Sequence, residues 1–215
     1  MNWPKQIVVV RHAQSEGNVL ATEDLSWDIP ANHAFALTAK GKHQATLTGA
    51  YLRKEYGEFD AYFVSTFRRT QETLKCMYPE AQPAIDSRIN EMWRGIWHAM
   101  PHTELRNLYP AEEQIQKREG WYHYQPLGGH SCQDVELRVH SFCAYLREVY
   151  CDKKVLVCTH GNLGILFWRV VLNCLPAEAE HRYLHNGYKN ASVTVYEKNC
   201  IGELELLLDN FTPWE

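Results

Sequence analysis

The sequence predicts an α/β protein in which helices cover both faces of a mostly parallel β-sheet, a three-layer α/β/α sandwich. Short apolar runs rich in β-branched residues, at 7–10 and 155–158, are typical of strands that are buried on both faces. Helix-length segments with capping residues separate such runs. Strands and helices alternate along nearly the whole chain, which is the order that produces parallel sheets.

The first half of the chain begins with the strand at residues 7–10, followed by a polar surface excursion over residues 14–32. Thr38 is a typical helix N-cap for residues 39–56, and Gly57 is a typical C-terminal stop. The next predicted elements are a strand at 60–64, a helix at 66–77 that ends before Pro79, and a weaker strand at 84–89.

The second half contains an irregular, aromatic segment and then regular elements again. Residues 93–125 follow no clear period. They are expected to form a lid over a ligand-binding site and to contribute to substrate specificity. Ser131 and Asp134 have the form of a capping box for a helix that reaches Tyr150, supported by an i,i+4 pair of Asp134 and Arg138. The remaining predictions are strands at 155–158, 192–197 and 203–208 and a buried helix at 163–174.

Length and composition indicate one folded domain over residues 1–215. Hydrophobic residues make up 45% and charged residues 22%, as in ordinary globular proteins. The net charge of -4 and the lack of a basic stripe exclude nucleic acid as an expected partner. An exposed strand edge would allow a homodimer, but no residue pattern demands one.

The cysteines and the apolar segments predict a soluble, cytoplasmic protein. The seven cysteines form no Cys-x-x-Cys pair, so free thiols in a reducing compartment are expected. The apolar run at the N-terminus is too short for a signal peptide. The segment 162–175 is too short to span a bilayer and is interrupted by Arg169.

Two histidines stand directly after predicted parallel strands. His12 follows the first strand together with Arg11, and His160 follows the strand at 155–158. Ligands of open α/β sheets bind beyond the carboxyl ends of the strands, so both side chains are expected at one site. A single histidine in such a place is more often structural, but two of them next to an arginine favour a functional site.

An arginine and a glutamate are further candidates for the same functional site. The pair Arg68 and Arg69 follows the strand at 60–64 and stands in the first turn of a helix, where an anion is favoured. A solvated basic face is the commoner role of such a pair. Glu91 follows the weaker strand at 84–89 and indicates nothing by itself.

The order of these segments is more specific than any one of them. They are RHAQSEGN at 11–18, LTAKGKHQA at 37–45, STFRRTQET at 65–73, INEMWRG at 89–95, THG at 159–161 and NASV at 190–193. In this order they resemble the motifs of the histidine phosphatase superfamily, in the branch that includes the cofactor-dependent phosphoglycerate mutases. The resemblance implies the phosphoglycerate mutase-like α/β/α sandwich and assigns the family arginine to Arg69.

The resemblance also implies a mechanism without metal or cofactor. His12 would attack phosphorus and form a phosphohistidine, while Arg11 and Arg69 bind the phosphoryl oxygens and His160 completes the cationic pocket. Glu91 would protonate the leaving alkoxide and then activate water. The substrate is expected to be a small phosphorylated metabolite, and Asn18 and the Gly161 N–H are weaker candidates for phosphate contacts.

Three positions depart from the family pattern and leave the substrate open. Ala13 replaces a glycine, so the backbone there is either ordinary or strained. His98 and His130 replace two glutamates near the expected pocket rim. Residues of the lid that are available for leaving-group contacts, each more often a surface or packing residue, are Arg94, His98, His102, Arg106, Tyr109, Lys117, Arg118 and His123.

The pair His181 and His185 has the i,i+4 spacing of metal ligands. No third ligand is apparent in the sequence, so we expect no metal site there.

Two other functions stay open beside a phosphomonoesterase. In a mutase, the phosphohistidine would return its phosphoryl group to the substrate, and the segment 160–162 resembles the mutase form. Against a mutase, the chain is shorter than the glycolytic mutases, and residues 93–125 do not show their paired-arginine clamp in recognisable form. A non-catalytic protein that binds phosphorylated ligands is the other alternative, but the chain keeps every predicted catalytic residue.

Overall fold

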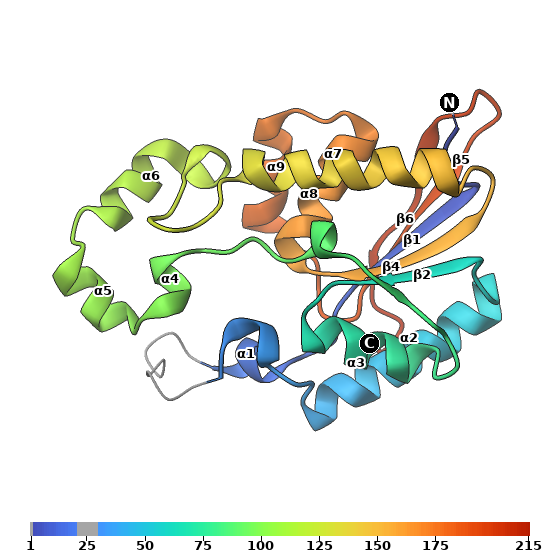
Figure 1. Ribbon diagram of the computed structural model, residues 1–215, viewed down its shortest axis with the longest axis horizontal. Coiled ribbons are helices and arrows are strands. Elements are labelled where there is room, and N and C mark those ends of the chain that lie inside the picture. The colour runs from blue at the N-terminus through green and yellow to red at the C-terminus, as the bar shows by residue number, and fades with distance from the viewer. Residues whose placement is uncertain (1, 21–29) are drawn as a thin grey trace.

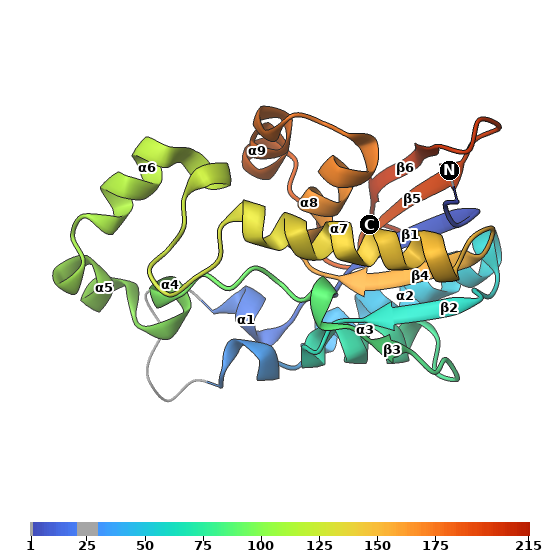
Figure 2. The same cartoon turned by 45° about the horizontal axis from the view of Figure 1, so that its top comes forward.

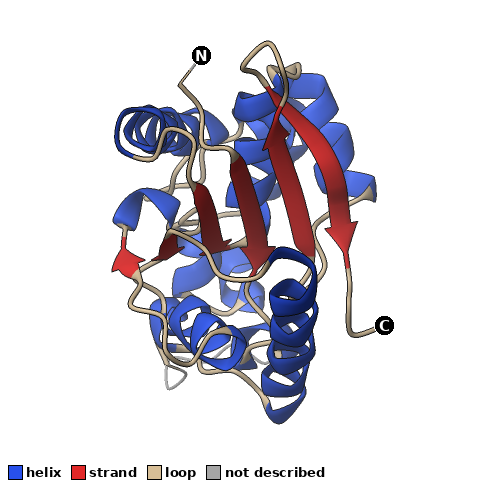
Figure 3. Ribbon diagram, turned by 90° about the vertical axis from the view of Figure 1, so that its right-hand side faces the viewer, coloured by secondary structure: helices blue, strands red, loops and turns tan. Residues whose placement is uncertain are grey.

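The computed structural model describes residues 2–20 and 30–215, and within them the strands form one six-stranded sheet in the order β3-β2-β4-β1-β5-β6. The pairs β3–β2, β2–β4 and β4–β1 are parallel, whereas β1–β5 and β5–β6 are antiparallel. Figure 3 shows the sheet between its two helical layers. The predicted fold class is therefore confirmed.

The strands are β1 (Gln6–Arg11), β2 (Ala61–Val64), β3 (Ala84–Ile85), β4 (Lys154–Thr159), β5 (Val193–Lys198) and β6 (Leu204–Phe211). The α-helices are α1 (Glu16–Val19), α2 (Ala39–Tyr56), α3 (Arg68–Met77), α4 (Ile96–Ala99), α5 (His102–Leu108), α6 (Glu112–His123), α7 (Cys132–Val149), α8 (Gly161–Leu172) and α9 (Pro176–His185). Two 3₁₀ helices, η2 (Asn32–Ala34) and η3 (Ser87–Ile89), complete the described elements.

Between their end residues, the central strands β1 and β4 are apolar, as expected for strands that are buried on both faces. In β1, Ile7 and Val9 belong to the core between the sheet and α7 and α8, whereas Val8 and Val10 belong to the core on the side of α2 and α3. Strand β4 alternates in the same way. In Figure 1, α7, α8 and α9 lie on one side of the sheet and α2 and α3 on the other.

Caps confirm both predicted ends of α2 and the predicted start of α7, whereas the helices predicted at 66–77 and 163–174 are α3 and α8, which begin at Arg68 and Gly161. The Thr38 side chain accepts a hydrogen bond from the Gly41 N–H at the start of α2, and Gly57 ends that helix at φ 69°. Ser131 and Asp134 form the predicted capping box of α7. The predicted pair of Asp134 and Arg138 is wrong, because Arg138 donates instead to the carbonyls of Ser87, Arg88 and Asn90.

The segment 93–125 is helical and not irregular as predicted. It contains α4, α5 and α6, which form an arm beyond the sheet, in line with the start of α7 (Figures 1 and 2). Short helices with a kink at Gly120, whose φ is 73°, do not produce a sustained period in the sequence. Trp121 anchors the arm by stacking on Tyr183 of α9, with ring centroids 4.5 Å apart.

Two further predictions are corrected at the sheet and behind it. The strand predicted for 84–89 ends at Ile85, and the chain continues into η3 because Asp86 caps that turn by accepting from the Arg88 N–H. Helix α9 was not predicted, although Pro176 at its start is a typical N-terminal signal. The polar stretch predicted over 14–32 lies partly outside the described residues and otherwise contains α1.

The structure also bears on the expectations for the cysteines and for membrane-spanning segments. All seven cysteines carry free thiols. Among the residues that the structure describes, no helix combines the length and the hydropathy needed to cross a membrane.

Candidate active site

The topology brings the two strand-end histidines together. Strands β1 and β4 are parallel neighbours, and Arg11 pairs with Thr159 at their carboxyl ends. His12 and His160 therefore leave the sheet side by side, with ring centroids 5.2 Å apart and ring planes at 63°. Both side chains are buried, at 3% and 0% exposure.

A cavity of about 190 Å³ opens beside His12, between the strand ends and the arm. The residues that line it are Arg11, His12, Ser15, Gly17, Asn18, Asn32, Phe35, Arg69, Glu91, Met92, Arg94, His98 and Asn162. The structure thus gathers Arg11, His12, Arg69 and Glu91 on one cavity. His160 is buried next to His12 and is not among the lining residues.

The hydrogen bonds of His12 define which ring nitrogen is reactive. Nδ1 lies 2.8 Å from the Ala13 carbonyl, which only accepts, so Nδ1 carries the hydrogen and Nε2 keeps its lone pair. Burial, and then the charges of Arg69 and Arg11, lower the pKa of His12 well below its usual 6.5. The ring is therefore neutral at pH 7, with the lone pair of Nε2 beside the cavity.

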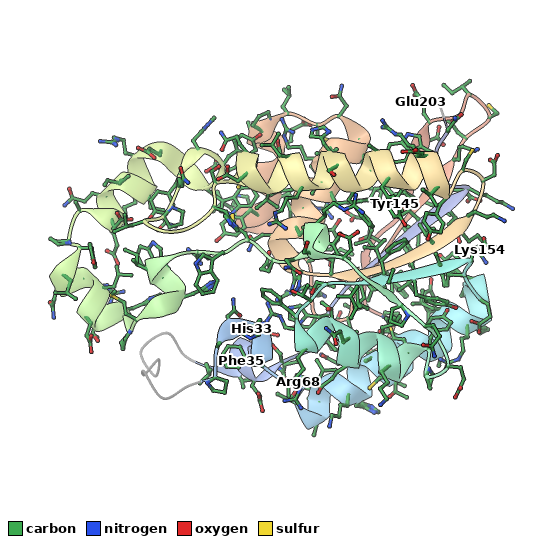
Figure 4. All side chains as sticks on the ribbon, viewed as in Figure 1. His33, Phe35, Arg68, Tyr145, Lys154 and Glu203 are labelled. Carbon is green, nitrogen blue, oxygen red and sulfur yellow. The ribbon has the colours of Figure 1, made fainter. Side chains whose placement is uncertain are left out.

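Arg69 and Arg11 place two guanidinium groups beside that nitrogen. Arg69 Nε donates to His12 Nε2 over 3.2 Å, and burial lowers the pKa of Arg69 to about 10, so it stays charged at pH 7. Arg11 donates to the Tyr188 carbonyl through Nη1, while its buried Nε has no partner within the described residues. Arg68, marked at the start of α3 in Figure 4, is exposed and pairs with Glu72.

Ser65, at the end of β2, holds His160. Its Oγ lies 2.8 Å from His160 Nε2, and the Phe67 ring packs against His160 with centroids 5.0 Å apart. Burial, followed by the charges of Arg69, His12 and Arg11, lowers the pKa of His160 well below 6.5. His160 is therefore neutral at pH 7, and its Nδ1 has no hydrogen-bond partner among the described residues.

Glu91 is the carboxylate of the cavity. Its Oε1 accepts from the Met92 N–H over 2.9 Å, and its Oε2 lies 3.4 Å from the Asn162 N–H. Its negative charge raises the pKa of both Arg11 and Arg69 against the effect of burial. The site thus places one imidazole ring, two guanidinium groups and one carboxyl group around the same cavity.

The two weaker candidates for phosphate contacts, Asn18 and Gly161, lie at different positions relative to the cavity. Asn18 lines the cavity, and its Oδ1 accepts from Ser15 N–H and from Asn190 Nδ2. Gly161 opens α8 beside Arg11 and does not line the cavity, whereas the next residue, Asn162, does. Of the two readings of Ala13, the ordinary one holds, because its φ is not positive.

The departures at the pocket rim have different surroundings. His98 lines the cavity, and its Nδ1 accepts from the Arg94 N–H and from Asn32 Nδ2, each over 3.4 Å. His130 is exposed and accepts from the Trp93 N–H. Of the eight lid residues considered as leaving-group contacts, Arg94 and His98 line the cavity.

The histidine pair of α9 has no further ligand nearby. The rings of His181 and His185 lie 4.5 Å apart. The chain as described, residues 2–20 and 30–215, contains no cluster of three or more His, Cys, Asp and Glu side chains arranged for a metal ion.

Sequence reasoning missed several residues that shape the site. Asn32 accepts from Arg69 Nη1 through its carbonyl over 2.6 Å, and Asn190 Nδ2 donates to the His12 carbonyl over 3.0 Å. Phe67 also packs under the Arg69 guanidinium, 4.6 Å from its ring centroid. Phe35, labelled in Figure 4, lines the cavity near α1. Only Phe67 and Asn190 lie in motifs with a sequence signal; Asn32 and Phe35 have none.

The family of this chain follows from its match to a known family model. Residues 7–202 match the model of the histidine phosphatase superfamily, branch 1. The chain belongs to this superfamily. It is 30% identical over 207 residues to the 2,3-bisphosphoglycerate-dependent phosphoglycerate mutase of Azorhizobium caulinodans, covering 91% of this chain and 97% of that protein. It is 29% identical over 167 residues to the phosphoglycerate mutase of Schizosaccharomyces pombe, covering 74% and 75% of the two chains.

Two solved structures with the same fold carry the names of phosphatases. A putative α-ribazole-5'-P phosphatase from Escherichia coli matches with a TM-score of 0.76 at 22% identity, over 96% of this chain and 97% of the other. A mycobacterial glucosyl-3-phosphoglycerate phosphatase matches with a TM-score of 0.75 at 23% identity, over 96% and 98% of the two chains. At this identity the similarity supports the fold.

Proposed function

We propose that this protein is a phosphomonoesterase that hydrolyses a small phosphorylated metabolite through a phosphohistidine on His12. The observation that carries the proposal is the neutral ring of His12, whose Nδ1–H is held by the Ala13 carbonyl and whose Nε2 faces Arg69. A lone pair fixed beside a guanidinium group is suited to attack a phosphoryl group bound there.

The residues that line the cavity supply the groups needed for the two steps of the reaction. In the first step, His12 Nε2 bonds to phosphorus and the bond to the ester oxygen breaks, while protonated Glu91 gives that oxygen its hydrogen. In the second step, the Glu91 carboxylate takes a proton from water, the water oxygen bonds to phosphorus, and the P–N bond breaks. Arg11 and Arg69 bind the phosphoryl oxygens throughout.

The role of His160 differs from the one that the sequence implied, in which it completes a cationic pocket. It is neutral at pH 7, because burial and the neighbouring arginines disfavour its charge. A bound phosphoryl dianion opposes that effect, so His160 takes up a proton on substrate binding and its Nδ1–H then donates to the phosphoryl group.

The test is the nucleophile variant His12→Ala. We expect phosphatase activity to fall at least about 10³-fold, because no other side chain replaces the attacking nitrogen. The exposed His140 of α7 supplies the matched control, His140→Ala, which should retain full activity. Substrates for the screen are sugar phosphates, phosphoglycerates, nucleotides and phosphopeptides, with circular dichroism to confirm folding.

Trapping the intermediate completes the test. Brief mixing with a ³²P-labelled substrate, followed by alkaline quenching, should leave an acid-labile label on the wild type and none on His12→Ala. Unchanged activity in His12→Ala would overturn the proposal. Failure on every substrate class, together with no labelled protein, would favour a protein that binds phosphorylated ligands without turnover.

A mutase is the second candidate, since the curated relatives include phosphoglycerate mutases and Asn162 of the mutase-like segment lines the cavity. Incubation with 3-phosphoglycerate and catalytic 2,3-bisphosphoglycerate separates the two activities. Isomerisation without release of phosphate would identify the mutase.

A further inference from the structure

A half-buried arginine of α7 contacts the backbone just before Glu91. Arg138 is not among the residues that line the cavity, and the proposed reaction does not use it. Its Nη1 donates to three carbonyls, those of Ser87, Arg88 and Asn90, over 3.4, 3.1 and 3.0 Å. These carbonyls belong to η3 and to the residue after it, and the chain continues from there into Glu91.

The same short segment is held from the sheet by two further hydrogen bonds. Thr159 Oγ1, at the end of β4, donates to the Ile89 carbonyl over 2.8 Å. The Asn90 side chain accepts from the Thr66 N–H over 2.9 Å, just beyond β2. Each carbonyl from 87 to 90 thus accepts from a side chain of a distant element, and Arg138 serves three of these four carbonyls.

The Glu91 side chain has few contacts that could fix it on their own. Its Oε1 accepts from the N–H of the next residue, Met92, and its Oε2 lies 3.4 Å from the Asn162 N–H. The place of the carboxyl group therefore depends on the backbone before it. Proton transfer requires the donor to lie within about 2.6–3.2 Å of the accepting oxygen, so a small shift of this backbone is enough to slow the reaction.

The electrostatics place Arg138 near Glu91 as well. Burial lowers the pKa of Arg138, and the charges of Glu91 and Asp134 raise it again. Within residues 2–20 and 30–215, Arg138 and Glu91 form no ion pair, and the buried Nη2 of Arg138 has no hydrogen-bond partner. A buried donor without an acceptor is costly, so the side chain contributes little net stability. Its main contribution is the fixed position of the backbone before Glu91.

We propose that Arg138 is a positioning residue for Glu91, which fixes the backbone that leads into Glu91 and so aligns its carboxyl group with the leaving oxygen. The inference rests on the proposed function, in which Glu91 is the proton donor. Without Arg138, three carbonyls lose their donor and the segment moves toward other partners. We expect the loss in proton transfer and not in phosphate binding, because Arg11 and Arg69 belong to β1 and α3.

Two esters that differ in their need for a proton test this on the full-length protein. p-Nitrophenyl phosphate releases a stable phenolate, whereas benzyl phosphate releases an alkoxide that has to be protonated as it leaves. kcat/KM covers the steps up to the phosphohistidine, so hydrolysis of that intermediate does not obscure the comparison. As a reference, Glu91→Gln should lower kcat/KM by about 10²- to 10⁴-fold for benzyl phosphate and by less than about tenfold for p-nitrophenyl phosphate.

Variants of Arg138 should reproduce this selectivity on a smaller scale. Arg138→Met should lower kcat/KM for benzyl phosphate by about 10- to 100-fold and for p-nitrophenyl phosphate by less than about threefold. Arg138→Lys keeps the charge and a donor and should recover part of the loss. Arg138→Gln replaces Arg138→Met if the latter does not fold, with the same expectation.

The same helix supplies the matched control. Arg147 is exposed on α7, and its guanidinium carbon lies 3.8 Å from the centroid of the Trp3 ring. Arg147→Met therefore removes a packed arginine from α7 at a distance from the Glu91 segment. It should leave the ratio of the two kcat/KM values unchanged.

The outcomes separate this inference from the proposed function. If Glu91→Gln shows the selectivity and Arg138→Met does not, the inference is overturned and the phosphatase stays in place. An equal loss for both esters in Arg138→Met also overturns it, because a general disturbance of the fold does not distinguish leaving groups. If no phosphate ester is turned over and no phosphoenzyme forms, the phosphatase is wrong.

A crystal structure of Arg138→Met tests the positioning without turnover. It decides the inference where the kinetic comparison gives no rate or where Glu91→Gln treats both esters alike. A displaced or disordered Glu91 carboxyl group supports the role of Arg138. A Glu91 side chain in the same place and with the same contacts as in the wild type overturns it.

Discussion

At the scale of single residues, the position of one hydrogen on His160 determines what this histidine can offer a phosphoryl group. Thr70 Oγ1 donates to the Phe67 carbonyl over 2.8 Å, so the Ser65 hydroxyl gives its own hydrogen to Thr70 over 2.9 Å. Ser65 Oγ is then left to accept from His160 Nε2–H. Nδ1 of His160 then carries no hydrogen and has no partner in the described chain, so it is the ring nitrogen that is free to take up a proton.

Removal of the Ser65 hydroxyl should therefore weaken catalysis without unfolding the protein. In Ser65→Ala, His160 Nε2 loses its buried partner and the ring is no longer held in one orientation. We expect kcat/KM to fall by about tenfold, which corresponds to the ~1–1.5 kcal/mol of one hydrogen bond. The pH profile should change as well, because the orientation of His160 sets its proton uptake, and steady-state kinetics between pH 5 and 8 will show both effects.

The chain offers a matched control for this variant. Ser192 is equally buried at 0% exposure, and its Oγ has no hydrogen-bond partner among the described residues. Ser192→Ala should keep both the activity and the pH profile. A similar loss in Ser192→Ala and Ser65→Ala would show that the effect is general disturbance of the core.

At the scale of elements, helix α2 supports the loop that carries His12, the proposed nucleophile. The Gln14 carbonyl accepts from the Thr38 N–H, and the Gln14 side chain accepts from Thr38 Oγ1 over 2.9 Å. Gly41 lies one turn into α2, and a Cβ on it would approach the Gln14 carbonyl oxygen to 2.0 Å. The start of the helix and the segment after His12 therefore touch backbone to backbone, which glycine alone permits.

Gly41→Ala is expected to lower stability and activity together. In an ordinary helix this change stabilises by about 1 kcal/mol, but here the methyl group displaces the Gln14 backbone and costs about 1–3 kcal/mol. Because Gln14 is two residues from His12, kcat should fall as well. Urea unfolding and steady-state kinetics on the same preparation measure the two effects.

Gly57 at the other end of α2 separates stability from activity. Its φ of 69° makes alanine strained, yet a Cβ there meets no atom within 4 Å. Gly57→Ala should thus lose about 1–3 kcal/mol of stability and keep its kcat. An active Gly41→Ala would contradict the role of α2 in holding the nucleophile loop.

At the scale of the whole molecule, burial of neutral histidines couples stability to pH. The pKa values of His12, His98 and His160 are all lowered in the folded state, with burial as the largest cause. The unfolded chain takes up protons on these groups below about pH 6.5, and the folded chain does not until the pH is lower. The unfolded state then binds more protons, so stability falls as the pH falls through 6.5.

We therefore expect the free energy of unfolding to decrease between pH 7.5 and pH 5.5. Each of the three histidines contributes at most about 1.4 kcal/mol per pH unit in the lower part of this range. Urea unfolding at several pH values, in buffer free of phosphate, measures the slope, and His12→Gln should reduce it. Constant or rising stability on acidification would contradict the neutral state of these rings.

Local sequence patterns were enough to predict the layered fold and the residues that gather at the cavity. Apolar runs at 7–10 and 155–158 require strands buried on both faces, because such runs have no polar side to turn to water. The caps at Thr38 and Ser131 define helix starts through local hydrogen bonds, which depend on neighbouring residues alone. The ordered motifs around His12 and Arg69 likewise predicted residues that meet at one cavity.

Features that depend on contacts between distant segments could not be predicted from local patterns and became visible in the folded chain. The helices of the arm gain their stability from packing such as Trp121 on Tyr183, which no local period reveals. Arg138 bonds to half-buried carbonyls some fifty residues away and not to its helical neighbour Asp134, because tertiary packing brings those acceptors within its reach. The neutral state of His160 and the meeting of Arg94, His98 and Asn32 at one cavity follow from burial and from the topology, which a linear pattern does not contain.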